Sequence, residues 1–271
     1  MTHVLGALAP LKDVRDYLIQ TSQTNFPKEY KVKYLPEVKD QGQVGSCVAH
    51  ATATILEILD YQENGQRVKL STDFIYGIQN LEYNKLTPGM YLRDACRIVK
   101  DYGDCSWNSV STNTEQPDVG ESLRRQLSDA VFEEASVYKV KSYARCDRES
   151  AMKYAIMKYG PVLASVNWHN ENYIDSEGVI HMDESSGYGR HAIVVYGWNE
   201  AGWLCRNSWG RNFGKDGNFI YPYTSKFNEA WSFVDADNDD VKKTKHTSSL
   251  WDYIYRIINS IINWFQKKSS R

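Results

Sequence analysis

The chain has 271 residues, of which 42% are hydrophobic and 24% are charged; this composition excludes a wholly disordered or fibrous protein and allows a large buried core. The net charge of −2 gives no general reason to expect a nucleic-acid partner. The charge is uneven: residues 241–271 contain seven basic residues and one acidic residue, so this tail carries +6 and the preceding 240 residues carry −8. We therefore expect the tail to bind a partner of its own or to fold back onto the body.

The five cysteines are too few for a disulfide scaffold and odd in number, which predicts free thiols in a reducing compartment. The first residues have no basic region ahead of an apolar one, so no signal peptide is predicted, and no apolar run is long enough to span a membrane. These features predict an intracellular protein. No pair of histidines or cysteines has the spacing of a zinc site, and neither a metal nor a cofactor is expected.

Helices are predicted for the first half of the chain. A lead-in, residues 1–34, is interrupted by prolines and shows little periodicity. Helical spacing of apolar residues then predicts helices at Gly45–Tyr61, Ser71–Asn80 and Leu92–Tyr102.

The second half changes to short β-rich runs separated by Gly, Asn and Asp. The strands are predicted at Val137–Tyr143, Pro161–Val166, Ala192–Trp198, Trp203–Arg206 and Asn218–Tyr223. Helices followed by strands are typical of an α+β protein, and we predict a helical part at 35–130 and a β part at 131–235.

The acidic cluster Asp235, Asp237, Asp239 and Asp240 is interpreted as part of a linker at 236–249, and residues 250–266 are interpreted as an amphipathic helix with basic flanks. Two hypotheses remain open for this helix. It either docks on protein, including a second copy of the chain, or binds a membrane surface through its aromatic residues and basic flanks.

One cysteine differs from the others in its setting. Cys47 follows Gly45 and Ser46 at the start of a predicted helix, where free N–H groups and the helix dipole favour an anion and are expected to lower the pKa of the thiol. His191 comes 144 residues later, within the spacing known for a catalytic cysteine–histidine pair. Asn207 follows after a further 16 residues, and its amide oxygen could orient the imidazole.

Three blocks of sequence resemble the signature blocks of papain-like cysteine peptidases. They are residues 41–49 (QGQVGSCVA), 189–192 (GRHA) and 207–210 (NSWG). Weaker similarity extends the resemblance over about residues 35–235. The resemblance implies a two-lobed fold with the active site in the cleft between a helical lobe and a β lobe.

The resemblance also implies the role of each residue. Cys47 is the expected nucleophile, His191 its proton partner, and Asn207 the residue that orients His191. Gln41 matches the side chain that stabilises the oxyanion, and Trp209 matches the indole that shields the contact between His191 and Asn207. Candidate substrate-binding residues are Gly89, Met90 and Ala192.

These observations predict a cysteine endopeptidase that cleaves protein or peptide substrates through an acyl-enzyme. The alternatives are a papain-like transferase or isopeptidase and a catalytically weak papain-like binding module. The lead-in contains Asp13, Arg15, Asp16 and Tyr17, similar to a short motif in family members without a long pro-segment. Residues 1 to about 25 are therefore expected either to lie in the cleft and restrain activity or to pack on the back of the β lobe.

Overall fold

The computed structural model describes residues 3–10, 13, 16–82, 88–111, 123 and 126–234. The predicted linker and the amphipathic helix at 250–266 lie outside these residues. Among the described residues, no helix is both long enough and apolar enough to cross a bilayer.

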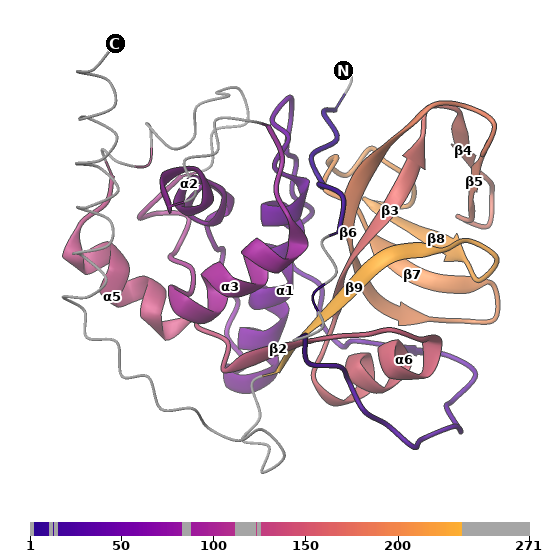
Figure 1. Cartoon of the computed structure of the whole chain (residues 1–271), viewed down its shortest axis with the longest axis horizontal. Helices are drawn as coiled ribbons and strands as arrows, with labels where there is room; N and C mark the ends of the chain where they lie inside the picture. The colour runs from indigo at the N-terminus through magenta and orange to yellow at the C-terminus, as the bar shows by residue number, and fades with distance from the viewer. Residues whose placement is uncertain are drawn as a thin grey trace.

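The structure has two lobes: most helices lie on one side, and the sheet lies on the other together with the helix at residues 149–158 (Figure 1). The helices are α1 (Cys47–Asn64), α2 (Thr72–Glu82), α3 (Leu92–Asp101), α5 (Asp129–Val137) and α6 (Glu149–Lys158). The strands are β1 (Tyr30–Lys31), β2 (Ser142–Arg145), β3 (Val162–His169), β4 (Asn172–Ile174), β5 (Ile180–Met182), β6 (Tyr188–Trp198), β7 (Gly202–Arg206), β8 (Asn218–Pro222) and β9 (Phe227–Val234). The prediction of an α+β fold with two lobes is confirmed.

The first 13 residues of the central helix α1 are all buried, and most of them are apolar or small; His50 and Glu57 are the buried exceptions. It ends at Gly65, which adopts a left-handed conformation with φ of 68° and donates its N–H to Tyr61 O. Glycine takes this conformation without the steric cost of a Cβ. The helix therefore has a fixed end in the helical lobe and its N-terminus at the junction of the lobes.

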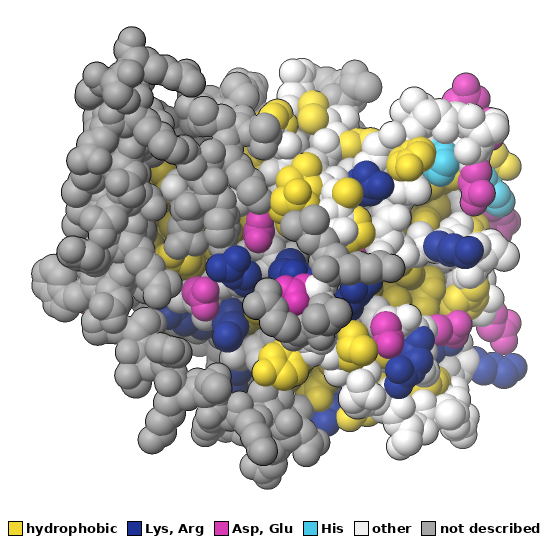
Figure 2. All heavy atoms as spheres, in the orientation of Figure 1, with side chains coloured by type: hydrophobic (Ala, Val, Ile, Leu, Met, Phe, Trp, Pro, Cys, Tyr) yellow, Lys and Arg dark blue, Asp and Glu magenta, His cyan; other side chains and the backbone are white. Residues whose placement is uncertain are grey.

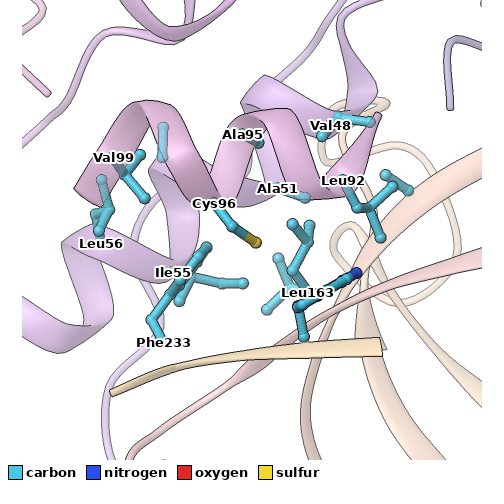
Figure 3. Close-up of a cluster of buried hydrophobic side chains, with 14 of the residues drawn as sticks. Val48, Ala51, Ile55, Leu56, Leu92, Ala95, Cys96, Val99, Leu163 and Phe233 are labelled. Carbon is cyan, nitrogen blue, oxygen red and sulfur yellow. The ribbon is translucent and has the colours of Figure 1, made fainter. Parts of the chain in front are cut away.

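The sheet is antiparallel, in the order β2-β9-β3-β6-β7-β8, and β1 pairs with the long strand β6. Its inner face packs on α1 and α3 (Figure 3), where Leu92 and Cys96 of α3 meet Leu163 of β3 and Phe233 of β9. This shared core joins the two lobes beneath the cleft.

One predicted strand was wrong in its bounds. Residues 129–137 form α5, which Ser128 caps by accepting a hydrogen bond from Val131 N, and the strand begins only at Ser142. The β-branched residues around Val137 suggested a strand, but the capping serine and the packing of Phe132 under α2 favour a helix. The prediction also missed α6, β1, β4, β5 and β9.

Candidate active site

Cys47 is the first residue of α1 and is completely buried. The sequence predicts a lowered pKa for its thiol, but in this structure the pKa is raised to about 11, because burial disfavours the thiolate more than any hydrogen bond favours it. Backbone N–H groups of Ala192 and Gly6 act in the opposite direction, by hydrogen-bonding the sulfur. Cys47 lies at the N-terminus of a helix, as predicted. The loss of solvent around its sulfur reverses the expected direction of its pKa shift.

His191 lies on β6 and is also fully buried. Its Nε2 is 2.7 Å from Asn207 Oδ1, and the same oxygen accepts a hydrogen bond from Ser208 N at 2.7 Å. Because a backbone N–H can only donate, the Asn207 atom at this position is the oxygen, and Nε2 of His191 must carry the proton. Nδ1, which has no hydrogen-bond partner among the described residues, is then left free to accept a proton.

The pKa of His191 is lowered to about 4, first by burial and further by the charge of His3, while the bond to Asn207 acts in the opposite direction. In this state the imidazole and the Cys47 thiol are therefore both neutral at pH 7.

Aromatic rings enclose the imidazole. Trp209 lies 4.7 Å from the ring of His191, and Trp168 of β3 packs edge-on against it at 5.2 Å. Trp168 also contacts Trp209 at 4.8 Å. The sequence prediction named Trp209 and missed Trp168, which lies in no motif and is recognisable only because it neighbours β6 in the sheet.

Gln41 is fully buried. Its Nε2 donates to Val4 O at 2.8 Å and to Val44 O at 3.0 Å, and its Oε1 accepts from Ser208 Oγ at 2.7 Å. Ser208 O also accepts from Gln41 N at 2.9 Å. Ser208 therefore orients both Gln41 and Asn207, a role that the sequence prediction missed although the residue lies within a signature block.

The segment before Gln41 is tied to α1 by a buried ion pair. Lys39 Nζ lies 2.6 Å from Glu57 Oε1, and the same oxygen accepts a hydrogen bond from Leu70 N at 2.7 Å. This pair fixes the loop that carries Gln41 relative to the helix that carries Cys47.

Residues 3–8, which we call the strap, lie in the cleft. The strap descends between the helices and the sheet (Figure 1) and is hydrogen-bonded to both lobes. Ala7 N donates to Arg190 O at 3.2 Å on the β side. Met90 N donates to Gly6 O at 2.7 Å, and Leu8 N donates to Met90 O at 3.0 Å on the helical side. Met90, predicted to bind the substrate backbone, thus pairs with the strap, and Gly89 adjoins it with φ of 103°.

The strap passes closest to the catalytic residues at Gly6. A Cβ at this position would lie 1.9 Å from Gly45 O, so no other residue fits here without displacement. On one side of Gly6, Leu5 packs on Gly189 next to His191. At the end of the strap, His3 stacks on Trp209 with centroids 5.1 Å apart and lies 3.0 Å from Asp40 Oδ1.

The segment that follows the strap is bound to α3 by ion pairs. Arg93 of α3 forms ion pairs with Asp16 and, at 3.5 Å, with Asp13. Ile19 N then donates to Arg145 O of β2 at 2.9 Å. Figure 2 shows basic and acidic side chains next to one another in the middle of this face. Residues 3–8 therefore lie in the cleft, whereas residues 13 and 16–19 lie on α3 and against strand β2.

Comparison with known proteins identifies the family. A sequence profile described as "Papain family cysteine protease" matches residues 23–231. The chain belongs to the papain family of cysteine proteases.

The chain is 29% identical over 187 residues to a cathepsin L of Sarcophaga peregrina, a match that covers 66% of this chain and 53% of that protein. It is 28% identical over 211 residues to the viral cathepsin of Adoxophyes honmai nucleopolyhedrovirus, covering 76% of this chain and 58% of the relative. The chain thus spans little more than half the length of these two relatives.

Among solved structures, xylellain, a cysteine protease from Xylella fastidiosa, superposes with a TM-score of 0.72 at 22% identity, covering 86% of this chain and 96% of xylellain. At this identity the likeness supports the fold.

Proposed function

We propose that this papain-family protein is a cysteine endopeptidase that the strap keeps latent. The observation that carries the proposal is the strap itself, a stretch of polypeptide whose main chain is hydrogen-bonded along the cleft and whose Val4 carbonyl lies on Gln41 Nε2. A cleft that binds main-chain amides on both sides of a cysteine and a histidine suits a peptide substrate better than a small acyl ester.

The path of the strap favours internal cleavage. The chain passes Cys47 and continues at both ends, toward Trp209 at His3 and past Met90 at Leu8. A cleft that holds chain on both sides of the nucleophile accommodates the interior of a long substrate, as an endopeptidase requires.

In the proposed reaction, Nδ1 of His191 takes the thiol proton and Sγ of Cys47 attacks the substrate carbonyl carbon. The oxyanion receives hydrogen bonds from Gln41 Nε2 and from Cys47 N–H. His191 then gives its proton to the departing amine, which leaves a thioester on Cys47. Water, deprotonated by His191, hydrolyses the thioester and restores the thiol.

The strap contacts the expected oxyanion donor through Val4, whose carbonyl accepts a hydrogen bond from Gln41 Nε2, whereas the Gly6 carbonyl accepts one from Met90 N. The strap therefore occupies the place of a substrate main chain, and we expect it to inhibit by excluding the substrate.

The test is covalent labelling with a peptidyl vinyl sulfone, followed by cleavage assays on a denatured protein substrate. One adduct at Cys47, formed faster once the strap is displaced, together with internal cleavage of the protein, supports the proposal. An adduct without hydrolysis would favour the transferase or isopeptidase alternative. The binding-module alternative would give no adduct in any form of the protein.

Gln41→Ala should lower kcat when the strap is displaced and raise the rate of Cys47 labelling when the strap is in place. With the strap displaced, loss of one oxyanion donor should lower kcat by about 10²–10³-fold. With the strap in place, loss of the bond to Val4 O should accelerate labelling, since one restraint on the strap is gone. Gln43→Ala, at an exposed position two residues away, should change neither kcat nor the labelling rate. Equal activities of Gln41→Ala and Gln43→Ala would contradict the role of Gln41 as an oxyanion donor.

Acidification should favour release of the strap. In the strapped state the pKa of His191 is about 4 instead of 6.5, and solvent entering after release should raise it. The strapped state then binds fewer protons, so falling pH between about 6.5 and 4 shifts the equilibrium toward release. Hydrogen exchange at Ala7 and Leu8 N–H, corrected for intrinsic rates, should report this shift.

Two variants separate the contributions to this pH dependence. It should disappear in His191→Asn, whose side chain takes up no proton in this range, and persist in His3→Gln, which retains His191. A pH dependence unchanged in His191→Asn would show that another group controls the strap.

A further inference from the structure

A cavity of about 540 Å³ lies beside α1, separate from the catalytic groups. None of Cys47, His191 and Asn207 lines it. Its walls are the segment that leads to Gln41, one face of α1, the chain between α1 and α2, and the ring of Trp107. Cavities of this size hold small organic ligands. The charged residues of the lining are Glu37, Lys39, Asp40, Glu57, Arg67 and Lys69.

The buried end of the cavity contains an imidazole with a free nitrogen. His50 and Glu57 are seven residues apart on α1, hence on one face of the helix, and both are buried. Burial lowers the pKa of His50 to about 4, so its ring is neutral at pH 7. Its Nδ1 lies 3.0 Å from Ser46 O, and because a carbonyl oxygen can only accept, Nδ1 carries the proton. Nε2 is then an acceptor, and it has no hydrogen-bond partner among the described residues.

Two cations lie at the exposed end of the cavity. The guanidinium carbon of Arg67 is 5.6 Å from the ring centre of Tyr34, and Lys69 Nζ is 4.3 Å from that of Trp107. All four residues line the cavity. Within the part of the chain that the structure describes, neither cation has an ion pair. The aromatic rings hold the two charges in place, and their N–H groups are available to a ligand.

The acidic residues of the lining do not neutralise these cations. Glu57 is paired with Lys39, and Oδ1 of Asp40 lies 3.0 Å from Nε2 of His3 in the strap. The remaining acidic residue, Glu37, is exposed. The unpaired charge of the lining is therefore positive and lies at the exposed end, whereas the buried end offers an acceptor.

We propose that this cavity binds a small hydroxylated phosphate monoester, such as a sugar phosphate. Its phosphate lies between Arg67 and Lys69, and one of its hydroxyl groups donates to His50 Nε2. A phosphate monoester carries nearly two negative charges at neutral pH, which match the two unpaired cations, and a guanidinium group binds two phosphate oxygens at once. This site is distinct from the cleft and does not depend on the proposed peptidase reaction.

The experiment titrates glucose 6-phosphate into the full chain by isothermal titration calorimetry. We expect a saturable one-to-one complex, and a Kd at least about 10-fold higher for inorganic phosphate and for glucose, because each lacks one end of the ligand. The double variant Arg67→Gln/Lys69→Gln should raise the Kd of glucose 6-phosphate by about 10- to 100-fold, as expected for hydrogen bonds to a charged group. Lys33→Gln is the matched control, since Lys33 is exposed, adjoins Tyr34 and does not line the cavity; it should leave the Kd unchanged.

His50→Phe tests the buried end, because it removes the acceptor and keeps a ring. It should raise the Kd of glucose 6-phosphate and leave that of inorganic phosphate unchanged. The double variant, at two exposed positions, covers the case in which His50→Phe does not fold. The inference would be overturned by absence of binding, by equal affinity for inorganic phosphate, or by an unchanged Kd in the double variant. Tighter binding in Gly6→Ala would also overturn it, because the probe would then lie in the cleft. Every readout is binding, so each of these failures would leave the peptidase function untouched.

Discussion

Gly6→Ala is expected to convert the latent protein into an active one. The added methyl group would lie 1.9 Å from Gly45 O, and that oxygen belongs to the backbone leading into α1, which cannot move without displacing Cys47. Forcing a methyl group into such a space typically costs about 1–3 kcal/mol, or roughly 5- to 150-fold in the equilibrium between bound and released strap. The rate of vinyl sulfone labelling at Cys47, read by intact mass, should rise by that factor.

Ala9→Ser is the matched control, since Ala9 follows the strap and is exposed. It should label at the rate of the unmodified chain. If Gly6→Ala labels no faster than the control while circular dichroism shows a folded protein, the strap is not what limits access to Cys47.

In the Gly6→Ala background, Cys47→Ala and His191→Ala are each expected to reduce peptide hydrolysis to background, a loss on the order of 10⁶-fold by analogy with other nucleophile–base pairs. The two losses should not add, because the thiol and the imidazole act as one unit. Cys47→Ala should abolish labelling, and His191→Ala should slow it, since the thiol then ionises without a proton acceptor.

Cys146→Ala removes another buried thiol, one outside the cleft, and should retain full activity. Hydrolysis by Cys47→Ala at more than background would assign the chemistry to a different nucleophile and would contradict the proposed mechanism.

Local sequence was sufficient to predict the catalytic elements. The helices around Cys47 and Leu92 follow from apolar periodicity, and the position of Cys47 at the helix start follows from the small residues before it. The contact between His191 and Asn207 could be predicted because their blocks resemble those of a known family. Each of these signals lies within a few residues of the group it concerns.

Features that depend on distant contacts could not be predicted in this way. The occupancy of the cleft by the strap requires Gly6 to meet Gly45 and Val4 to meet Gln41, and nothing in residues 3–8 alone specifies those partners. The raised pKa of Cys47 has the same origin, because its main cause is burial under chain that lies about 40 residues earlier. Strand β9 was missed, and its place beside β3 and not beside β8 depends on strand order and not on local sequence.

The buried thiol also has a consequence for chemical durability. Oxidation by peroxide proceeds through the thiolate and requires access to the sulfur. With its pKa at about 11 and its surface fully covered, Cys47 in the latent protein presents almost no thiolate at neutral pH, and the other four cysteines are buried as well. We therefore expect peroxide to oxidise Cys47 more slowly while the strap lies in the cleft than after the strap is displaced.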